Sequence, residues 1–126
     1  MTPTMAFNST NGALYMATGS PGGSSIIGAT VNVFLNVADF GLDLQEATDL
    51  ARVLGKNGET SAEAAIYEAE DGAVFSALKS RGFNFTSPVP TTATYGQVQT
   101  IVVGRDGNLY GAADKLRASQ ALAAGF

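Results

Sequence analysis

The residues best suited to chemistry lie together in one glycine-rich segment, Gly19–Ser25, which reads Gly-Ser-Pro-Gly-Gly-Ser-Ser. Apolar residues lead into it, and its last two residues, Ser24 and Ser25, open a long apolar segment with helical periodicity. A turn at the start of a helix points consecutive backbone N–H groups at one spot, at the positive end of the helix dipole. Such a spot can hold a carboxylate, a phosphate or the oxyanion of an acyl-transfer intermediate.

The segment matches none of the common glycine-rich or serine-based motifs. No Gly-Lys-Ser/Thr follows it as in a P-loop, and the glycine spacing of a dinucleotide fingerprint is missing. Ser20 does not sit in a Gly-x-Ser-x-Gly elbow, and the chain has no histidine to activate it. From the residues alone, an ordinary structural turn and an anion site both stay open.

The amino-acid composition excludes several kinds of site and of partner. The chain has 126 residues, seven Lys and Arg against eleven Asp and Glu, and neither Cys nor His. A net charge of -4 argues against a nucleic-acid partner, and the missing Cys and His remove disulfides and most zinc sites. We expect no metal and no cofactor. The most apolar stretch, residues 26–42, is too short and too polar to span a bilayer, and the first residues carry no signal-peptide pattern.

The pattern of apolar residues predicts an α+β fold in one domain, residues 1–126, with an antiparallel-rich sheet covered by helices. The expected strands are 5–7, 13–17, 64–68 and 83–85, followed by a hairpin of 97–103 with 108–113; the expected helices are 24–39, 43–53 and 71–81, with Asp43 and Asp71 as N-caps. The segments 55–60 and 86–95 are expected as loops. The first helix is apolar over most of its circumference, which predicts burial between layers.

Several segments, taken in order, resemble the gamma-glutamyltranspeptidase family. The likeness covers nearly the whole chain and rests on Met1–Thr4, Gly19–Ser24, Phe40–Leu42, Gln45–Thr48, Ala51–Val53, Leu78–Gly82, Gln99–Val103, Leu109–Asp114 and Ala124–Phe126. This resemblance implies an N-terminal-nucleophile hydrolase with a four-layered αββα sandwich. In that family a Thr at the start of the small subunit attacks the gamma-glutamyl carbonyl of glutathione, and the acyl-enzyme passes to water or to an acceptor amine.

The resemblance also implies roles for individual residues. Gly22 and Gly23 match the glycine pair whose backbone amides line the oxyanion hole, and Ser20, Gly22 and Gly23 are therefore expected to bind substrate. Thr2 would carry a free amine beside its hydroxyl only if Met1 were removed, and it stands where the family usually has Ser. The segment Leu54–Lys56 replaces a His-rich stretch of the family.

By this resemblance the chain corresponds to the C-terminal part of a small subunit, without the nucleophile. Its expected partners are the rest of the small subunit and the large subunit, or other copies of itself in their place, and a gamma-glutamyl compound is a possible ligand. We therefore expect a chain that is inactive alone, from a periplasmic or extracellular protein. The alternative is a freestanding, non-catalytic binding or scaffold domain that keeps the fold and an anion-binding Gly-Gly turn.

Overall fold

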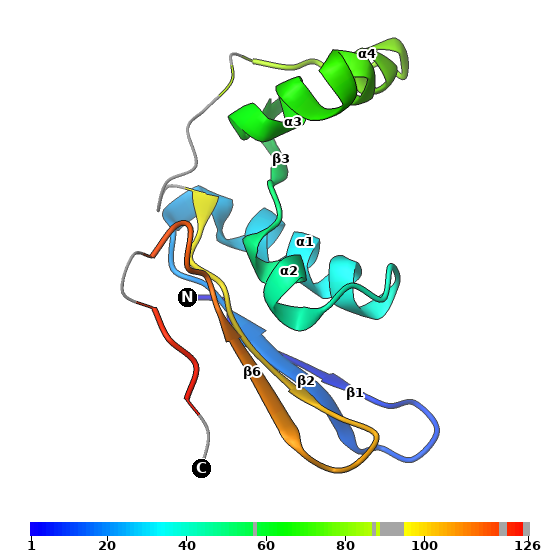
Figure 1. Ribbon diagram of the computed structural model, residues 1–126, viewed down its shortest axis with the longest axis vertical. Helices are drawn as coiled ribbons and strands as arrows, with labels where there is room; N and C mark the ends of the chain where they lie inside the picture. Colours follow the sequence, from blue (N-terminus) through cyan, green and yellow to red (C-terminus); the bar gives the residue numbers. More distant parts are fainter. Residues whose placement is uncertain (57, 87, 89–94, 119–120, 125–126) are drawn as a thin grey trace.

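The computed structural model describes residues 1–56, 58–86, 88, 95–118 and 121–124. Its main sheet has the order β1-β2-β5-β6 and is antiparallel throughout, with β1 at Thr4–Phe7, β2 at Leu14–Gly19, β5 at Gln99–Val103 and β6 at Leu109–Ala113. Two helices, α1 (Ile26–Ala38) and α2 (Leu44–Asp49), lie along one face of this sheet (Figure 1). The α+β prediction with an antiparallel sheet is thereby confirmed.

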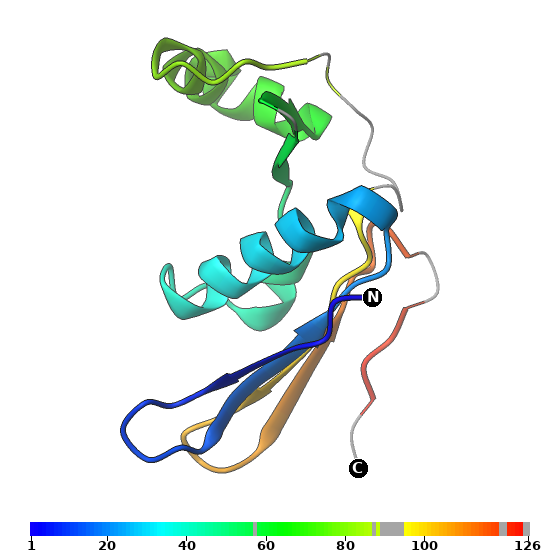
Figure 2. The same ribbon diagram turned by 180° about the vertical axis from the view of Figure 1, so that it is seen from behind.

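A second unit follows α2. A two-stranded sheet of β3 (Val53–Lys56) and β4 (Glu59–Ala62) leads into α3 (Ala64–Glu68), the 3-10 turn η2 (Ala69–Gly72) and α4 (Ala73–Ser80). Its side chains pack around an aromatic cluster in which the ring of Phe75 lies 4.6 Å from that of Tyr67 and 5.1 Å from that of Phe85. Figure 2 shows this unit at the opposite end of the molecule from the tips of the β1–β2 and β5–β6 hairpins.

Several local predictions are wrong in and next to this second unit. The helix predicted over 43–53 ends at Asp49, because Leu50 is extended. The loop predicted over 55–60 contains the second half of β3 and the first half of β4. The strand predicted over 64–68 is helical, in line with its alanines and the high helix propensity of Ala.

The start of the helix predicted over 71–81 also differs. The helix begins at Ala73, with Gly72 as its N-cap, because Glu70 and Asp71 adopt left-handed backbone angles. The expected strand 83–85 is reduced to one isolated bridge between Phe85 and Thr60. The loop expected over 86–95 lies largely outside the described residues.

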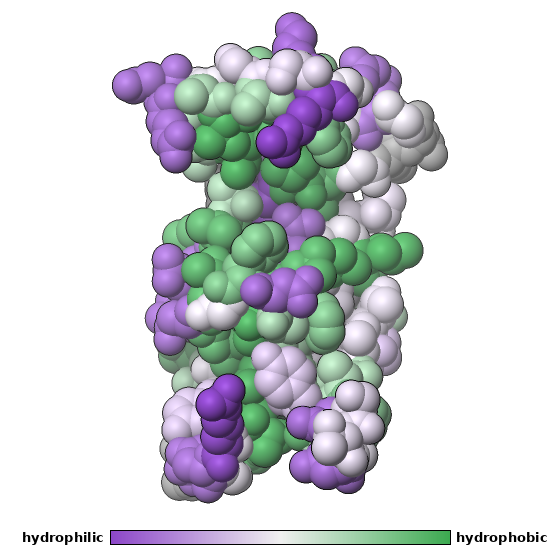
Figure 3. Space-filling view, turned by 90° about the vertical axis from the view of Figure 1, so that its right-hand side faces the viewer, coloured by the Kyte–Doolittle hydropathy of each residue, from purple (hydrophilic) through white to green (hydrophobic). Residues whose placement is uncertain are grey.

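Only one side of α1 is buried, which corrects the expectation of a helix buried nearly all round. Ala29 and Val33 are fully buried and pack with Val98 in the core under the sheet. On the other side, Ile27 and Val31 are 69% and 46% exposed, since no further layer of the described chain covers them. Figure 3 shows hydrophobic side chains exposed across the middle of the molecule.

The sheet face away from the helices is also open and apolar. Register places Met5, Ala17, Ile101 and Gly111 side by side across the four strands. Met5 is 66% exposed and Ile101 46% exposed, whereas the next row, which holds Thr18 and Thr100, is buried on the helix side. We call the sheet face that carries Met5, Ala17, Ile101 and Gly111 the open face.

Four buried charged side chains connect the two units. Arg52 follows α2, Glu63 precedes α3, and Asp114 and Arg117 follow β6; none is more than 4% exposed. The Arg52 guanidinium lies 2.8 Å from a carboxylate oxygen of Asp114. Arg117 donates through Nε and Nη2 to Glu63, and its Nη1 lies 3.4 Å from Asp114. Two cations and two carboxylates thus form one neutral buried network.

Backbone groups extend this ion network. The main-chain N–H of Arg52 donates to Glu63 at 2.8 Å, and that of Arg117 donates to Asp114 at 3.0 Å. The guanidinium of Arg52 donates to the carbonyls of Thr48, Tyr95 and Gly96. Burial lowers the pKa of Arg52, and the nearby Arg117 charge adds to the effect. Burial also acts to lower the pKa of Arg117, but the charges and hydrogen bonds of Glu63 and Asp114 together outweigh it and raise that pKa.

Asp114→Asn should strongly destabilise the chain. The substitution leaves two buried guanidinium groups with one carboxylate between them, and breaking a buried ion pair costs about 3–5 kcal/mol. Urea unfolding of the chain measures the loss. Glu59→Gln, at an exposed position on β4, is the control and should stay within about 0.5 kcal/mol of the wild type. A loss of less than ~1 kcal/mol for Asp114→Asn would contradict this account.

Candidate functional site

The glycine-rich turn lies where β2 ends and α1 begins. Gly22 has φ 133° and Gly23 has φ 60°, backbone angles that L-residues with a side chain rarely adopt. A single 3-10 turn, η1 (Gly23–Ser25), then leads directly into α1, with the N–H of Ser25 donating to the carbonyl of Gly22 at 3.2 Å. The two glycines are needed because the chain reverses direction here within two residues.

This helix start carries no side-chain cap of its own. Neither Gly22, the N-cap of η1, nor Ser25, the N-cap of α1, forms a side-chain capping bond, and the first turn of α1 has no acidic residue. The N–H of Ser25 and that of Ile26 bond to the carbonyls of Gly22 and Gly23, so the donors that this helix start can offer to an anion are the N–H groups of Gly22 and Gly23. Gly23 is exposed and Gly22 is half-buried. The geometry therefore suits an oxyanion or a carboxylate.

Ser20 is placed differently from the two glycines. Its side chain is fully buried, and its hydroxyl donates to the carbonyl of Pro21 at 2.6 Å and accepts from the N–H of Gln97 at 2.8 Å. Gly96 lies against it: a Cβ added there would stand 2.7 Å from the Ser20 oxygen and 2.6 Å from the Cβ of Ala29. The structure thus brings Ser20 to the inner side of the turn and Gly22 and Gly23 to its outer side.

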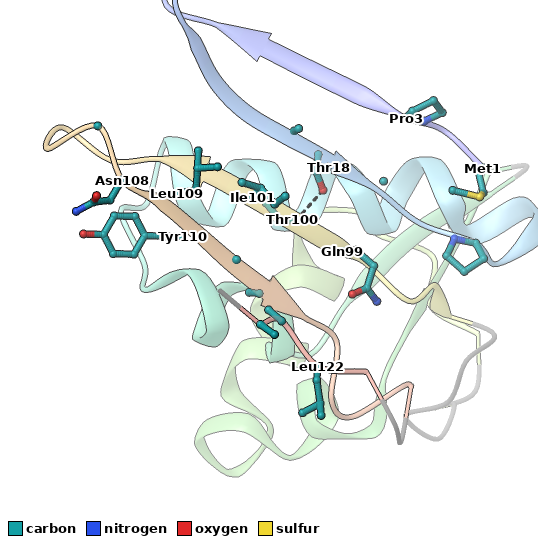
Figure 4. Close-up of a pocket in the computed structure, with 18 residues that line it drawn as sticks. Met1, Pro3, Thr18, Gln99, Thr100, Ile101, Asn108, Leu109, Tyr110 and Leu122 are labelled. Atoms are coloured by element: carbon teal, nitrogen blue, oxygen red, sulfur yellow. Dashed lines mark hydrogen bonds between the residues drawn. The ribbon is translucent and has the colours of Figure 1, made fainter. Parts of the chain in front are cut away.

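A groove of about 1210 Å³ lies beside the turn, over the open face. Figure 4 shows Ile101 and Leu109 on its floor, with Pro3 from the start of the chain and Leu122 from its last described residues at the sides. The buried hydroxyls of Thr18 and Thr100 are 2.7 Å apart below it. Pro21 also lines the groove, so the glycine-rich turn and the open face adjoin.

Thr2 and the acidic residues are the other groups that the sequence offers for chemistry. Thr2 is exposed near the chain start, and its carbonyl accepts a hydrogen bond from the Thr4 hydroxyl at 3.3 Å. Among the described residues, no group of three His, Cys, Asp or Glu side chains could hold a metal ion. Within the same part of the chain, every helix is too short or too polar to cross a membrane.

Sequence reasoning missed the ion network behind the turn. The signal available was a lone charge between apolar neighbours: Arg52 stands between Ala51 and Val53, and Glu63 stands between two alanines. Such residues look like ordinary surface charges until the fold brings them together. Their link to the site runs through Gly96, whose carbonyl accepts from Arg52.

Comparison with solved structures shows which class of fold this chain has. The chain resembles a highly active mutant of the gamma-glutamyltranspeptidase from Pseudomonas nitroreducens with a TM-score of 0.74 and 26% identity, over 99% of this chain and 62% of that one. It resembles a mutant of the Helicobacter pylori enzyme with a TM-score of 0.73 and 28% identity, over 93% and 61%. An antiparallel sheet with helices on one face, shared with these structures, defines the class: an N-terminal-nucleophile-hydrolase fold.

Sequence comparison names the family. Residues 1–124 match the family model of gamma-glutamyltranspeptidase. The glutathione hydrolase proenzyme of Escherichia coli is 32% identical over 126 residues, covering 100% of this chain and 20% of that protein, and that of Bacillus subtilis is 34% identical, covering 97% and 20%. The chain belongs to the gamma-glutamyltranspeptidase family. It spans about a fifth of the length of these curated relatives.

Replacing the two glycines should destabilise the turn unequally. Gly23→Ala adds a Cβ in open space and carries only the left-handed backbone strain, about 1–2 kcal/mol, whereas Gly22→Ala at φ 133° should lose more. Urea unfolding measures the free energy of unfolding of the Gly22→Ala and Gly23→Ala variants. Gly55→Ala, also in open space but without a positive φ, is the matched control and should change stability by about 0.5 kcal/mol or less. Equal losses for all three variants would rule out the strain argument.

Proposed function

We propose that this chain supplies the oxyanion hole of a gamma-glutamyl transfer or hydrolysis reaction. The observation that carries the proposal is the position of Gly22 and Gly23 at an uncapped helix start, within a chain that matches the family over residues 1–124. Relatives bear the name glutathione hydrolase, which supports glutathione or another gamma-glutamyl amide as substrate. The nucleophilic Thr that the family resemblance implies would come from polypeptide outside this chain.

The chemistry asked of this chain is electrostatic. When a hydroxyl oxygen attacks the gamma-glutamyl carbonyl carbon, the carbonyl oxygen takes up the electron pair and becomes an oxyanion. Two backbone N–H groups at a helix start stabilise that charge more than they stabilise the neutral carbonyl. Collapse of the intermediate re-forms the carbonyl and breaks the C–N bond; the amine leaves with the proton that the attacking hydroxyl gave up, and an ester remains. Water or an acceptor amine then cleaves this ester by the same route and returns a proton to the hydroxyl. Gly22 and Gly23 act in both steps.

The open face supports the proposal that the active protein needs further polypeptide. Ile101 and Leu109, which line the groove, are 46% and 70% exposed, and Met5 on the same sheet face is 66% exposed. Apolar surface of this kind marks an interaction site. The chain spans about a fifth of its relatives, whose remaining length offers a covering layer. We therefore propose that the remainder of the small subunit and the large subunit cover this face, with a second copy of the chain as their substitute when they are missing.

Activity should require the parts outside this chain. The isolated chain, incubated with glutathione or a chromogenic gamma-glutamyl anilide, should release no product above the buffer rate, because an oxyanion hole without a nucleophile stabilises a transition state that never forms. The protein from the full coding region should turn the substrate over, and Gly22→Ala there should lower kcat by roughly 100-fold. Steady-state kinetics measure both.

Gly55→Ala in the same full-length protein is the matched control and should keep the wild-type kcat. Turnover by the isolated chain, or an unchanged kcat in Gly22→Ala, would overturn the proposed role of the turn. If the chain alone binds L-glutamate at millimolar concentration in an NMR titration, and the full coding region encodes no further domain, the non-catalytic binding domain becomes the better account.

The isolated chain should self-associate through the open face. Light scattering at high protein concentration should give a mass above that of the monomer, and Ile101→Lys should return it toward the monomer, because a charge at this position has no partner on an apolar surface. Ile27→Lys, at a comparably exposed site on α1, is the control and should leave the mass unchanged. A monomer for the unmodified chain would contradict the expected association.

A further inference from the structure

We propose that Ser20 is a positioning residue that sets the geometry of the Gly22–Gly23 turn from beneath it. This inference rests on the proposed oxyanion role of the turn and adds a residue to it. Ser20 is fully buried and separated from Gly22 only by Pro21. Its hydroxyl uses its proton on the carbonyl of Pro21 and accepts the N–H of Gln97, so it joins the turn to the segment that leads into β5.

The bond to Pro21 fixes the peptide that carries the first oxyanion donor. The carbonyl of Pro21 and the N–H of Gly22 belong to one planar peptide unit, so holding the oxygen at 2.6 Å from the Ser20 hydroxyl also orients that N–H. With φ 133°, Gly22 has no side chain to restrict this peptide. The Ser20 hydroxyl therefore restrains the Pro21–Gly22 peptide, which no side chain at Gly22 restrains.

The support for Ser20 is itself rigid. Gln97 donates to Ser20 through its backbone and, through its side-chain amide, to the carbonyl of Arg117 at 3.3 Å. The carbonyls of Tyr95 and Gly96 accept from Arg52 at 2.9 and 3.1 Å. Figures 1 and 2 both show this segment passing the N-terminal end of α1. Residues 95–97 are thus held by both arginines of the ion network, and they hold Ser20.

Gly96 makes room for the arrangement. Its φ is +84°, and a Cβ at this position would stand 2.7 Å from the Ser20 oxygen, so any side chain here would displace the hydroxyl. The close approach of Gly96 to Ala29 fixes the same segment against the first turns of α1. The start of the helix, the turn and residues 95–97 are therefore in direct contact.

Ser20→Ala in the isotopically labelled chain tests the proposal without any turnover. The ¹H–¹⁵N resonances of Gly22 and Gly23 should move or broaden, those of Gly12 and Gly107 in the distant hairpin turns should not, and hydrogen exchange of the Gln97 amide should accelerate about tenfold. Thr48→Val is the matched control, since it removes an equally buried hydroxyl that bonds to Leu44 within α2. It should leave the Gly22 and Gly23 resonances in place.

In the full-length protein, Ser20→Ala should lower kcat about tenfold or more with little change in KM, because it displaces a transition-state contact rather than a ground-state one. Ser20→Cys, which puts a larger atom with weaker hydrogen bonds at the same position, should show the same direction of change and serves if Ser20→Ala does not fold. Unmoved Gly22 and Gly23 resonances, or an unchanged kcat beside an active wild type, would overturn the positioning role. Moved resonances in a protein inactive toward gamma-glutamyl substrates would uphold it and overturn the proposed function instead.

Discussion

The buried ion network is the interaction on which the rest of this structure depends. Among the described residues, Arg52 is the largest side chain that is fully buried, and the cluster of buried apolar residues consists of Ala29, Val33 and Val98. Desolvation of four charges offsets most of their mutual attraction, so the network adds little net stability. Its effect is on geometry, because each charge is stable only with all its partners in place.

That requirement explains how distant segments reach a fixed arrangement. Arg52 joins the end of α2 to residues 95 and 96, Glu63 joins the start of α3 to both arginines, and Asp114 brings in the end of β6. The core between the main sheet and the two helices is small, and apolar packing alone is tolerant of small shifts. Charge-assisted hydrogen bonds are directional, so they do not tolerate such shifts.

The sequence was sufficient for the features that depend on neighbouring residues. Hairpin β5–β6, helix α1 and the Asp43 cap of α2 follow from alternation, helical spacing and capping chemistry. The β3–β4 hairpin was missed, because it is stabilised by contacts distant in the chain, such as the bond from Thr60 N–H to Asn84. The left-handed backbone angles of Glu70 and Asp71 were missed as well. The glycine turn was found from its composition, but the support beneath it was not.

The candidate site also combines a feature that neighbouring residues reveal with features that depend on distant contacts. Gly22 and Gly23 are recognisable because backbone donors need glycine at fixed spacing beside a helix start. The side chains that hold the turn have no such local pattern: Ser20 bonds to Gln97, 77 residues away, and Arg52 reaches Gly96 across 44. A site made of backbone amides has no catalytic side chain whose rotamer can adjust, so its precision must come from the framework behind it. In this chain that framework is polar and buried and joins segments far apart in the sequence, so the role proposed for residues 22 and 23 depends on side chains that lie behind the turn.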